Sequence, residues 1–185
     1  MNAWTPAERR LGFWSASSVA LLDVVYVLTG VVWLVSGGFE SSKPLEPEEP
    51  YLSLLEFLLF LSVPPPVALA AALHAYAEPT KKTSALAALA FMTAFATVTC
   101  GVHVVRLIVL RQLPAGEALE PSILRLYPWP SILLALDLLA WDLFLGLALL
   151  FACRVFSGRG RLHEAVRIGT MSSGGLCVFG FIGPL

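Results

Sequence analysis

Six ionisable side chains stand inside the long apolar stretches of this sequence, where a charged group is unusual. They are Asp23, Glu56, His103, Arg106, Asp137 and Asp142. Carboxylates and imidazoles accept and release protons, and a carboxylate can also hold a cation or an amine. A charged side chain at the centre of a bilayer costs about 2.5–3.5 kcal/mol on insertion scales, so such residues mark functional sites by default. We therefore take all six as candidate ligand-binding residues, and no pattern assigns a catalytic role to any of them.

The composition requires that most of the chain contacts lipid rather than water. Hydrophobic residues make up 57% of the 185 residues and charged residues only 14%, and the mean hydropathy is +0.78. A soluble domain of this length needs more polar residues to cover its surface. The formal net charge of -1 excludes a strongly basic face for nucleic acid. The expected partner is the lipid bilayer.

The apolar stretches are long enough to cross a bilayer as helices, which takes about 20 residues each. The sequence therefore predicts an all-α integral membrane bundle of five transmembrane helices, in a single domain that covers residues 1–185. The predicted helices cover residues 15–35, 51–77, 83–110, 131–156 and 168–185. Because the last stretch is short and the sequence stops while still apolar, a truncated chain that is part of a six-helix protein is the alternative.

The second apolar stretch carries Pro64, Pro65 and Pro66 at its middle. Each proline lacks an N–H donor and clashes with the preceding turn, so the helix must kink or break there. In lipid the freed carbonyl groups need new partners, and the Ser62 hydroxyl is a candidate. Two interpretations stay open, a simple kink and a break that lines a cavity.

The third apolar stretch has small residues at alternating spacings of three and four. They are Ala87, Ala90, Ala94, Thr97 and Gly101. Such a row predicts that a neighbouring helix approaches closely along it. Thr99, His103 and Arg106 lie off this row and share another face of the same helix.

Positive charge is distributed unequally between the two sides of the predicted bundle. The N-terminus, the 78–82 turn and the 154–167 turn together carry eight Lys and Arg residues, whereas the other two loops carry three. Positively charged loops stay on the cytoplasmic side. We therefore expect a multi-pass protein of the plasma membrane with a cytoplasmic N-terminus and an external, acidic 39–50 loop.

This orientation places four of the ionisable groups at one depth. At a rise of about 1.5 Å per residue, Glu56, His103, Arg106 and Asp137 all lie about one to two turns below the outer surface. Asp23 and Asp142 lie nearer the midplane. We expect Arg106 to pair with Asp137 or Glu56, with His103 beside them. The pair could brace the bundle, Arg106 could extend to the surface, or the groups could bind a ligand, an ion or a proton.

The sequence predicts neither a resident cofactor nor a metal centre. Cys100, Cys153 and Cys177 lie on three separate stretches without metal-ligand spacing. His74 and His103 are expected about 20 Å apart along the membrane normal, so one haem cannot join them. His163 is expected in a solvated cytoplasmic turn.

The acidic loop, followed by a helix with Glu56 and then Pro64–Pro66, resembles the EXPERA-type membrane proteins, which include sterol isomerases. The resemblance implies an intramembrane enzyme acting on a lipid, sterol or isoprenoid, and no residue role is carried over from it. In such an enzyme Glu56, Asp137 or His103 would supply the acid and base.

The charge pattern itself favours a different function. It favours binding or transport of a small ligand or ion, hydrophobic or cationic, through an outward-facing intramembrane polar pocket. A third interpretation is a structural subunit of a membrane complex or a homo-oligomer, in which the charges only stabilise the bundle.

Overall fold

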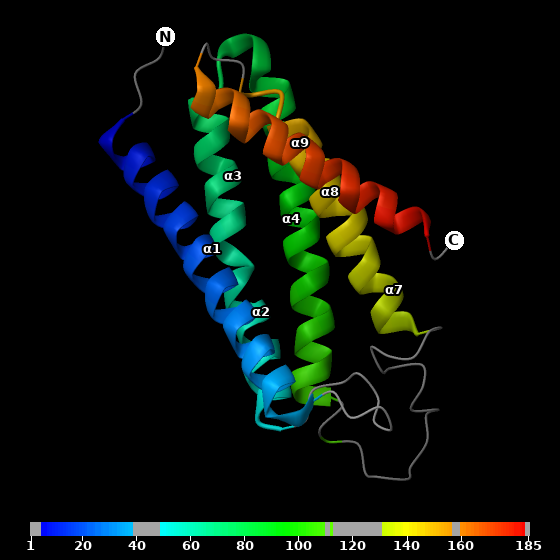
Figure 1. Ribbon diagram of the computed structural model, residues 1–185. Coiled ribbons are helices and arrows are strands. Elements are labelled where there is room, and N and C mark those ends of the chain that lie inside the picture. The colour runs from blue at the N-terminus through cyan, green and yellow to red at the C-terminus, as the bar shows by residue number, and fades with distance from the viewer. Residues whose placement is uncertain (1–4, 39–48, 110–111, 113–130, 157–159, 184–185) are drawn as a thin grey trace.

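The computed structural model describes residues 5–38, 49–109, 112, 131–156 and 160–183. Within these residues all regular structure is helical, and the helices stand side by side in one bundle (Figure 1). Five helical segments are long and apolar enough to cross a membrane, namely Pro6–Ser36, Tyr51–Tyr76, Pro79–Val109, Ile132–Ala152 and Arg161–Ile182. The predicted all-α class and the five apolar helices are confirmed.

Helix α1 (Pro6–Trp33) begins well before the predicted start at Ser15 and continues into a π turn, η1 (Leu34–Gly38). Thr5 caps its first turn. The Thr5 hydroxyl oxygen accepts from the Glu8 N–H at 3.3 Å, and the Glu8 carboxylate accepts from the Thr5 N–H at 2.8 Å. This reciprocal pair stabilises a helix start, so the polar residues before the apolar stretch are helical too.

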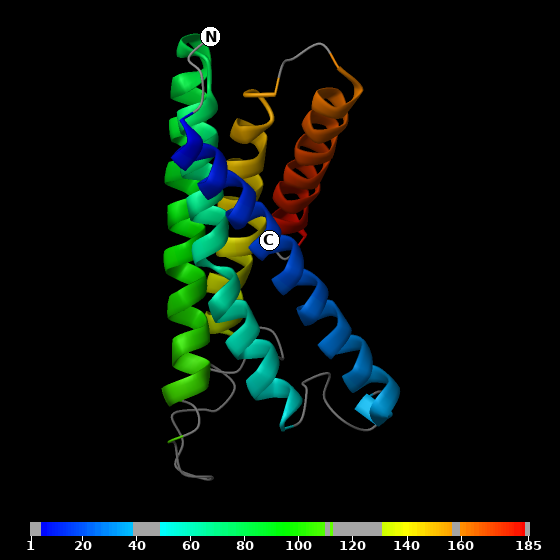
Figure 2. The ribbon, with the colours of Figure 1, turned by 90° about the vertical axis from the view of Figure 1, so that its left-hand side faces the viewer.

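The second span is broken at Val63, as the prolines predict. Helix α2 (Tyr51–Ser62) ends there, and helix α3 (Pro64–Tyr76) begins with Pro64 as its first residue. The Ser62 hydroxyl donates to the Leu59 carbonyl oxygen at 2.8 Å, whereas the carbonyls that lose their donors to the three prolines are those of Phe60, Leu61 and Ser62. Figure 2 shows that the chain changes direction between the two helices.

Helix α4 (Lys82–Val104) lies at the centre of the bundle, between a 3₁₀ turn, η2 (Pro79–Lys81), and a π turn, η3 (Val105–Val109). It packs against α2 and α3, and also against the fourth span. Its buried face consists of Ala85, Ala88, Met92, Phe95, Ala96, Thr99, Val102 and His103. The predicted row of small residues is wrong as the packing face, because Ala90, Thr97 and Gly101 are exposed. The predicted row of small residues and the observed buried face have the same helical spacing. Spacing alone therefore does not predict which of the two packs against a neighbour.

The fourth and fifth spans complete the bundle. Their elements are α7 (Ile132–Leu138), the π turn η4 (Leu139–Phe144), α8 (Leu145–Ala152) and α9 (Arg161–Ile182). Helix α9 starts at Arg161 rather than at the predicted Ile168. Residues 161–167, which the sequence placed in a turn, are therefore helical. It crosses the bundle obliquely, and its C-terminal end lies part-way along the bundle in both views (Figures 1 and 2).

Helices α8 and α9 approach closely through a pair of glycines. A Cβ atom added to Gly174 would lie 2.8 Å from the Gly146 carbonyl oxygen, and one added to Gly146 would lie 3.1 Å from the Gly174 carbonyl oxygen. Small residues allow this kind of backbone contact between membrane helices. A close backbone contact therefore exists between α8 and α9, and not along the row of small residues predicted on α4.

Aromatic side chains fill the core between α4 and the fourth span. Phe95 and Trp141 meet edge to face with ring centroids 4.9 Å apart, and Phe91 stacks on Phe151 at 5.7 Å. Such pairs contribute about 0.5–1.5 kcal/mol each beyond their buried area. They hold α4 against η4 and α8, and thereby position the polar residues on α4.

Candidate functional site

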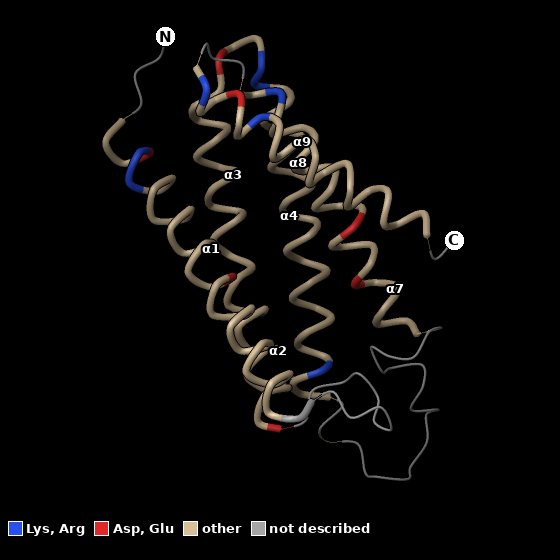
Figure 3. The backbone as a smooth tube through the Cα atoms, viewed as in Figure 1, with Lys and Arg blue, Asp and Glu red and all other residues tan. Residues whose placement is uncertain are grey.

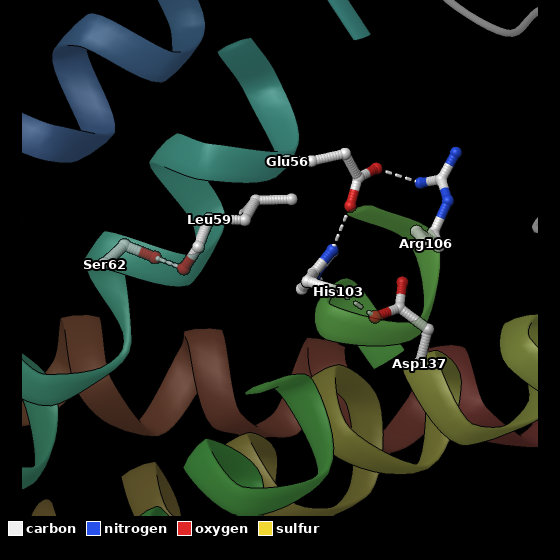
Figure 4. Close-up of polar contacts among 6 residues, drawn as sticks. All are labelled: Glu56, Leu59, Ser62, His103, Arg106 and Asp137. Atoms are coloured by element: carbon white, nitrogen blue, oxygen red, sulfur yellow. Dashed lines mark hydrogen bonds and ion pairs between the residues drawn. The ribbon is translucent and has the colours of Figure 1, made fainter. Parts of the chain in front are cut away.

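The four residues predicted to share one depth converge in the structure (Figure 4). Glu56 comes from α2, His103 from α4, Arg106 from η3 and Asp137 from α7. The exposed fraction is 4% for Glu56, 1% for His103 and 9% for Arg106, so these three are buried. The Asp137 side chain is 21% exposed. We call these four residues the polar cluster.

The Glu56 carboxylate is shared by two partners. Its Oε2 lies 2.5 Å from His103 Nδ1, and its Oε1 accepts from Arg106 Nη1 in an ion pair. Glu56, one of the two predicted partners, is therefore confirmed as an ion-pair partner of Arg106. Because Glu56 lies on α2 and both donors lie on the α4 segment, the carboxylate joins the two helices.

The bond to Glu56 fixes the orientation of the His103 ring. Since a carboxylate oxygen only accepts, Nδ1 carries the hydrogen and donates it. Nε2 then faces Asp137 Oδ1 across 4.0 Å, which is too long for a hydrogen bond. Both atoms are buried and have no hydrogen-bond partner among the described residues.

The charges of the four residues balance when His103 and Asp137 hold one proton between them. The Glu56 carboxylate and the Arg106 guanidinium are opposite charges in direct contact. The remaining pair is neutral overall as imidazole with carboxylic acid, or as imidazolium with carboxylate. Without that proton the cluster carries one excess negative charge in a medium of low dielectric, which is unfavourable. The arrangement therefore suits uptake of a proton or another small cation.

Thr99 adds a third buried polar atom without a partner. It lies one turn before His103 on the same face of α4 and is fully buried. Its hydroxyl oxygen finds no hydrogen bond within the described part of the chain. An unsatisfied buried group costs about 1–3 kcal/mol. Thr99, His103 and Asp137 thus each bury a polar atom whose hydrogen-bonding capacity is unused among the described residues.

Asp23 and Asp142 are not brought to the polar cluster. Asp23 is exposed on α1. Asp142 lies in η4 and faces α9, where a Cβ atom added to Gly180 would be 3.5 Å from its Oδ1. Their predicted part in ligand binding stays a prediction.

Sequence reasoning misplaced one histidine and missed the π turns. His163 was expected in a solvated turn, and this is wrong: it lies partly buried in the first turn of α9, with Nε2 3.4 Å from the Tyr76 hydroxyl. The error follows from the late predicted start of that helix. The π turns carry no distinctive residue pattern, yet η3 holds Arg106 and η4 begins two residues after Asp137.

Within the described residues, no group of three or more His, Cys, Asp or Glu side chains is placed to hold a metal ion. The donor set of the polar cluster, one imidazole and two carboxylates with a guanidinium among them, instead suits proton and ion-pair chemistry.

By length and hydropathy, five helices in the described part of the chain could each cross a membrane, which is the pattern of a multi-pass membrane protein. Comparison with protein-family models, curated proteins and solved structures finds no match. The resemblance to EXPERA-type proteins therefore rests on the acidic loop, Glu56 and the prolines alone.

Proposed function

We propose that this protein binds a small ligand or ion at the polar cluster and moves it across the membrane, with a proton as the species that fits best. The supporting observation is the buried pair of His103 Nε2 and Asp137 Oδ1, which face each other at 4.0 Å without hydrogen-bond partners. A proton taken up at Nε2 is stabilised by Asp137 on one side of the ring and by Glu56 on the other. Intramembrane carboxylate and histidine groups commonly form proton relays.

The ligand enters from the outer side of the plasma membrane, with the N-terminus in the cytoplasm. Most of the Lys and Arg residues that the structure describes lie at the end of the bundle that holds the start of α1 and the start of α9 (Figure 3). The polar cluster lies toward the opposite end, on α2 and the last turns of the α4 segment. Since basic residues favour the cytoplasmic side, the cluster belongs to the outer half of the membrane.

A flux assay tests this function. The protein is reconstituted into liposomes that contain a pH-sensitive dye, and a potassium gradient with valinomycin drives protons inward. We expect faster acidification than in protein-free liposomes, and a rate close to protein-free liposomes for His103→Gln and for Asp137→Asn. Asp142→Asn makes the same chemical change on the same span but outside the cluster, so it should keep the wild-type rate. Wild-type flux equal to protein-free liposomes, or an equal loss in Asp142→Asn, would refute the proposal.

A second function is supported by the Glu56–His103 contact. A histidine oriented through Nδ1 by a carboxylate, with Nε2 free, has the arrangement of a general base. Asp137 would then serve as the acid, and the substrate would be a lipid, sterol or isoprenoid that enters sideways from the bilayer. Native mass spectrometry of the purified protein distinguishes this function, because a co-purifying hydrophobic molecule should be lost when Asp137→Leu fills the site with an apolar side chain.

A third function is supported by the Glu56–Arg106 ion pair alone. The pair ties α2 to α4, which is what a structural subunit of a membrane complex or a homo-oligomer needs. In that case the wild-type protein shows neither proton flux nor ligand binding. The variants His103→Gln and Asp137→Asn then change only the thermal stability.

A further inference from the structure

A groove lies between the two outermost helices, far from the polar cluster. Gly12 of α1 forms one wall, Leu162 and Val166 of α9 form the other, and Leu69 and Leu73 of α3 form part of the floor. The cavity volume is about 350 Å³, within the range of about 300–1,000 Å³ that small-molecule sites span.

The groove has an apolar body and one polar corner. Its lining is apolar apart from Tyr76 and His163, and the Leu162 side chain at its edge is 75% exposed. At the corner, the Tyr76 hydroxyl and His163 Nε2 lie 3.4 Å apart. An amphipathic guest with a long apolar part and a polar head matches this lining.

The end of the bundle that holds the groove carries more basic than acidic residues among those described. The described basic residues at this end of the bundle are Arg9, Arg10, Lys81, Lys82, Arg154, Arg161 and Arg167, against the acidic Glu8, Glu78 and Glu164 (Figure 3).

Two of these basic residues stand about one helical turn from residues that line the groove. Arg9 precedes Gly12 by three positions on α1, and Arg167 follows His163 by four positions on α9. Residues at these helical spacings share a face. Each wall therefore carries a guanidinium group about one turn from the lining, so the head of the guest should be an anion.

We propose that this groove binds one anionic phospholipid, with an acyl chain along Leu69, Leu73 and Val166 and its phosphate near Arg9, His163 and Arg167. The occupant is a lipid because both walls, α1 and α9, are apolar helices with largely exposed surfaces. Basic residues near a membrane surface attract anionic lipids, and guanidinium groups bind phosphate through paired hydrogen bonds. The site is independent of the function proposed for the polar cluster.

Lipid titration followed by native mass spectrometry tests the site on the full chain in detergent. The probes are phosphatidylglycerol and phosphatidylcholine with identical acyl chains. We expect tighter binding of phosphatidylglycerol, and Arg167→Gln should reduce this preference about fivefold, the effect of one basic residue near an anionic surface. Equal binding of the two lipids would overturn the proposal.

Two phenylalanine variants on the same turn of α9 test the location. Val166→Phe fills the groove and should weaken binding of both lipids. Ile168→Phe places the same side chain on the opposite face of the helix and should bind like wild type. Equal binding by the two variants would place the lipid elsewhere. If Val166→Phe lowers the thermal midpoint, Leu162→Trp replaces it, since Leu162 is mostly exposed.

Discussion

Removing Glu56 should destabilise the protein more than removing Arg106, although the two residues form one ion pair. The structure gives the reason. Glu56 accepts from His103 and from Arg106 at once, so Glu56→Gln deprives two buried donors of a carboxylate. Arg106→Met leaves the Glu56–His103 contact in place, so the Glu56 carboxylate keeps one of its two donors.

The magnitudes follow from burial. Breaking a buried ion pair by removing one partner costs about 3–5 kcal/mol, which we expect for Glu56→Gln. Loss of a hydrogen bond to a charged group costs about 1.5–3 kcal/mol, which we expect for Arg106→Met. At about 2–4 °C per kcal/mol for a chain of this size, the thermal midpoint should fall by about 6–20 °C and about 3–12 °C respectively.

Thermal unfolding in detergent, followed by tryptophan fluorescence, measures these shifts. The double variant Glu56→Gln/Arg106→Met should be more stable than Glu56→Gln alone, because it no longer buries the guanidinium without its carboxylate. Glu78→Gln is the control, since Glu78 is 64% exposed in its pair with Lys81 at 3.1 Å and such pairs contribute at most about 1 kcal/mol. The prediction is wrong if Glu56→Gln costs no more than Glu78→Gln, or if the double variant is no more stable than Glu56→Gln.

Three further predictions test the fold and its orientation. In a background without native cysteines, Ser41→Cys should react with an impermeant thiol reagent on intact cells, and labelling only after lysis would reverse the topology. Gly174→Ala should destabilise the protein by about 1–3 kcal/mol, because its Cβ would lie 2.8 Å from a backbone oxygen, whereas Gly169→Ala, with nothing within 4 Å, should be neutral or stabilising in the same thermal assay. Pro65→Ala should leave the break at Val63, because Pro64 and Pro66 still lack donors; slow hydrogen exchange of the backbone N–H groups across 62–66 would contradict this.

Depth was the part of the candidate site that the sequence predicted best. The distance of a residue from the end of an apolar stretch follows from the helical rise alone. This distance predicted the same membrane depth for Glu56, His103, Arg106 and Asp137. The direction of each side chain around its helix depends on packing between helices. For that reason the sequence left Glu56 and Asp137 as equal partners for Arg106, while the structure pairs Arg106 with Glu56.

Helix ends and packing faces were harder to predict for different reasons. The start of α1 at Pro6 had a signal, since Thr5 and Glu8 have the spacing of a capping box. The start of α9 at Arg161 had none, because a membrane helix can continue into water with polar residues. On α4, two rows of residues have the same helical spacing, and the larger side chains of Met92 and Phe95 form the buried one.

The π turn η4 absorbs one extra residue between the polar cluster and the α8–α9 contact. A π turn holds one residue more than an α turn, so a deletion of one residue within Leu139–Phe144 would leave a continuous α-helix. Asp137 before the turn and Gly146 after it would then keep their faces, and Gly146 would still meet Gly174. The same deletion in an α-helical part of the span would rotate every following residue by about 100°. A lineage could therefore lose a codon here and keep both the polar residues around His103 and the docking of α9.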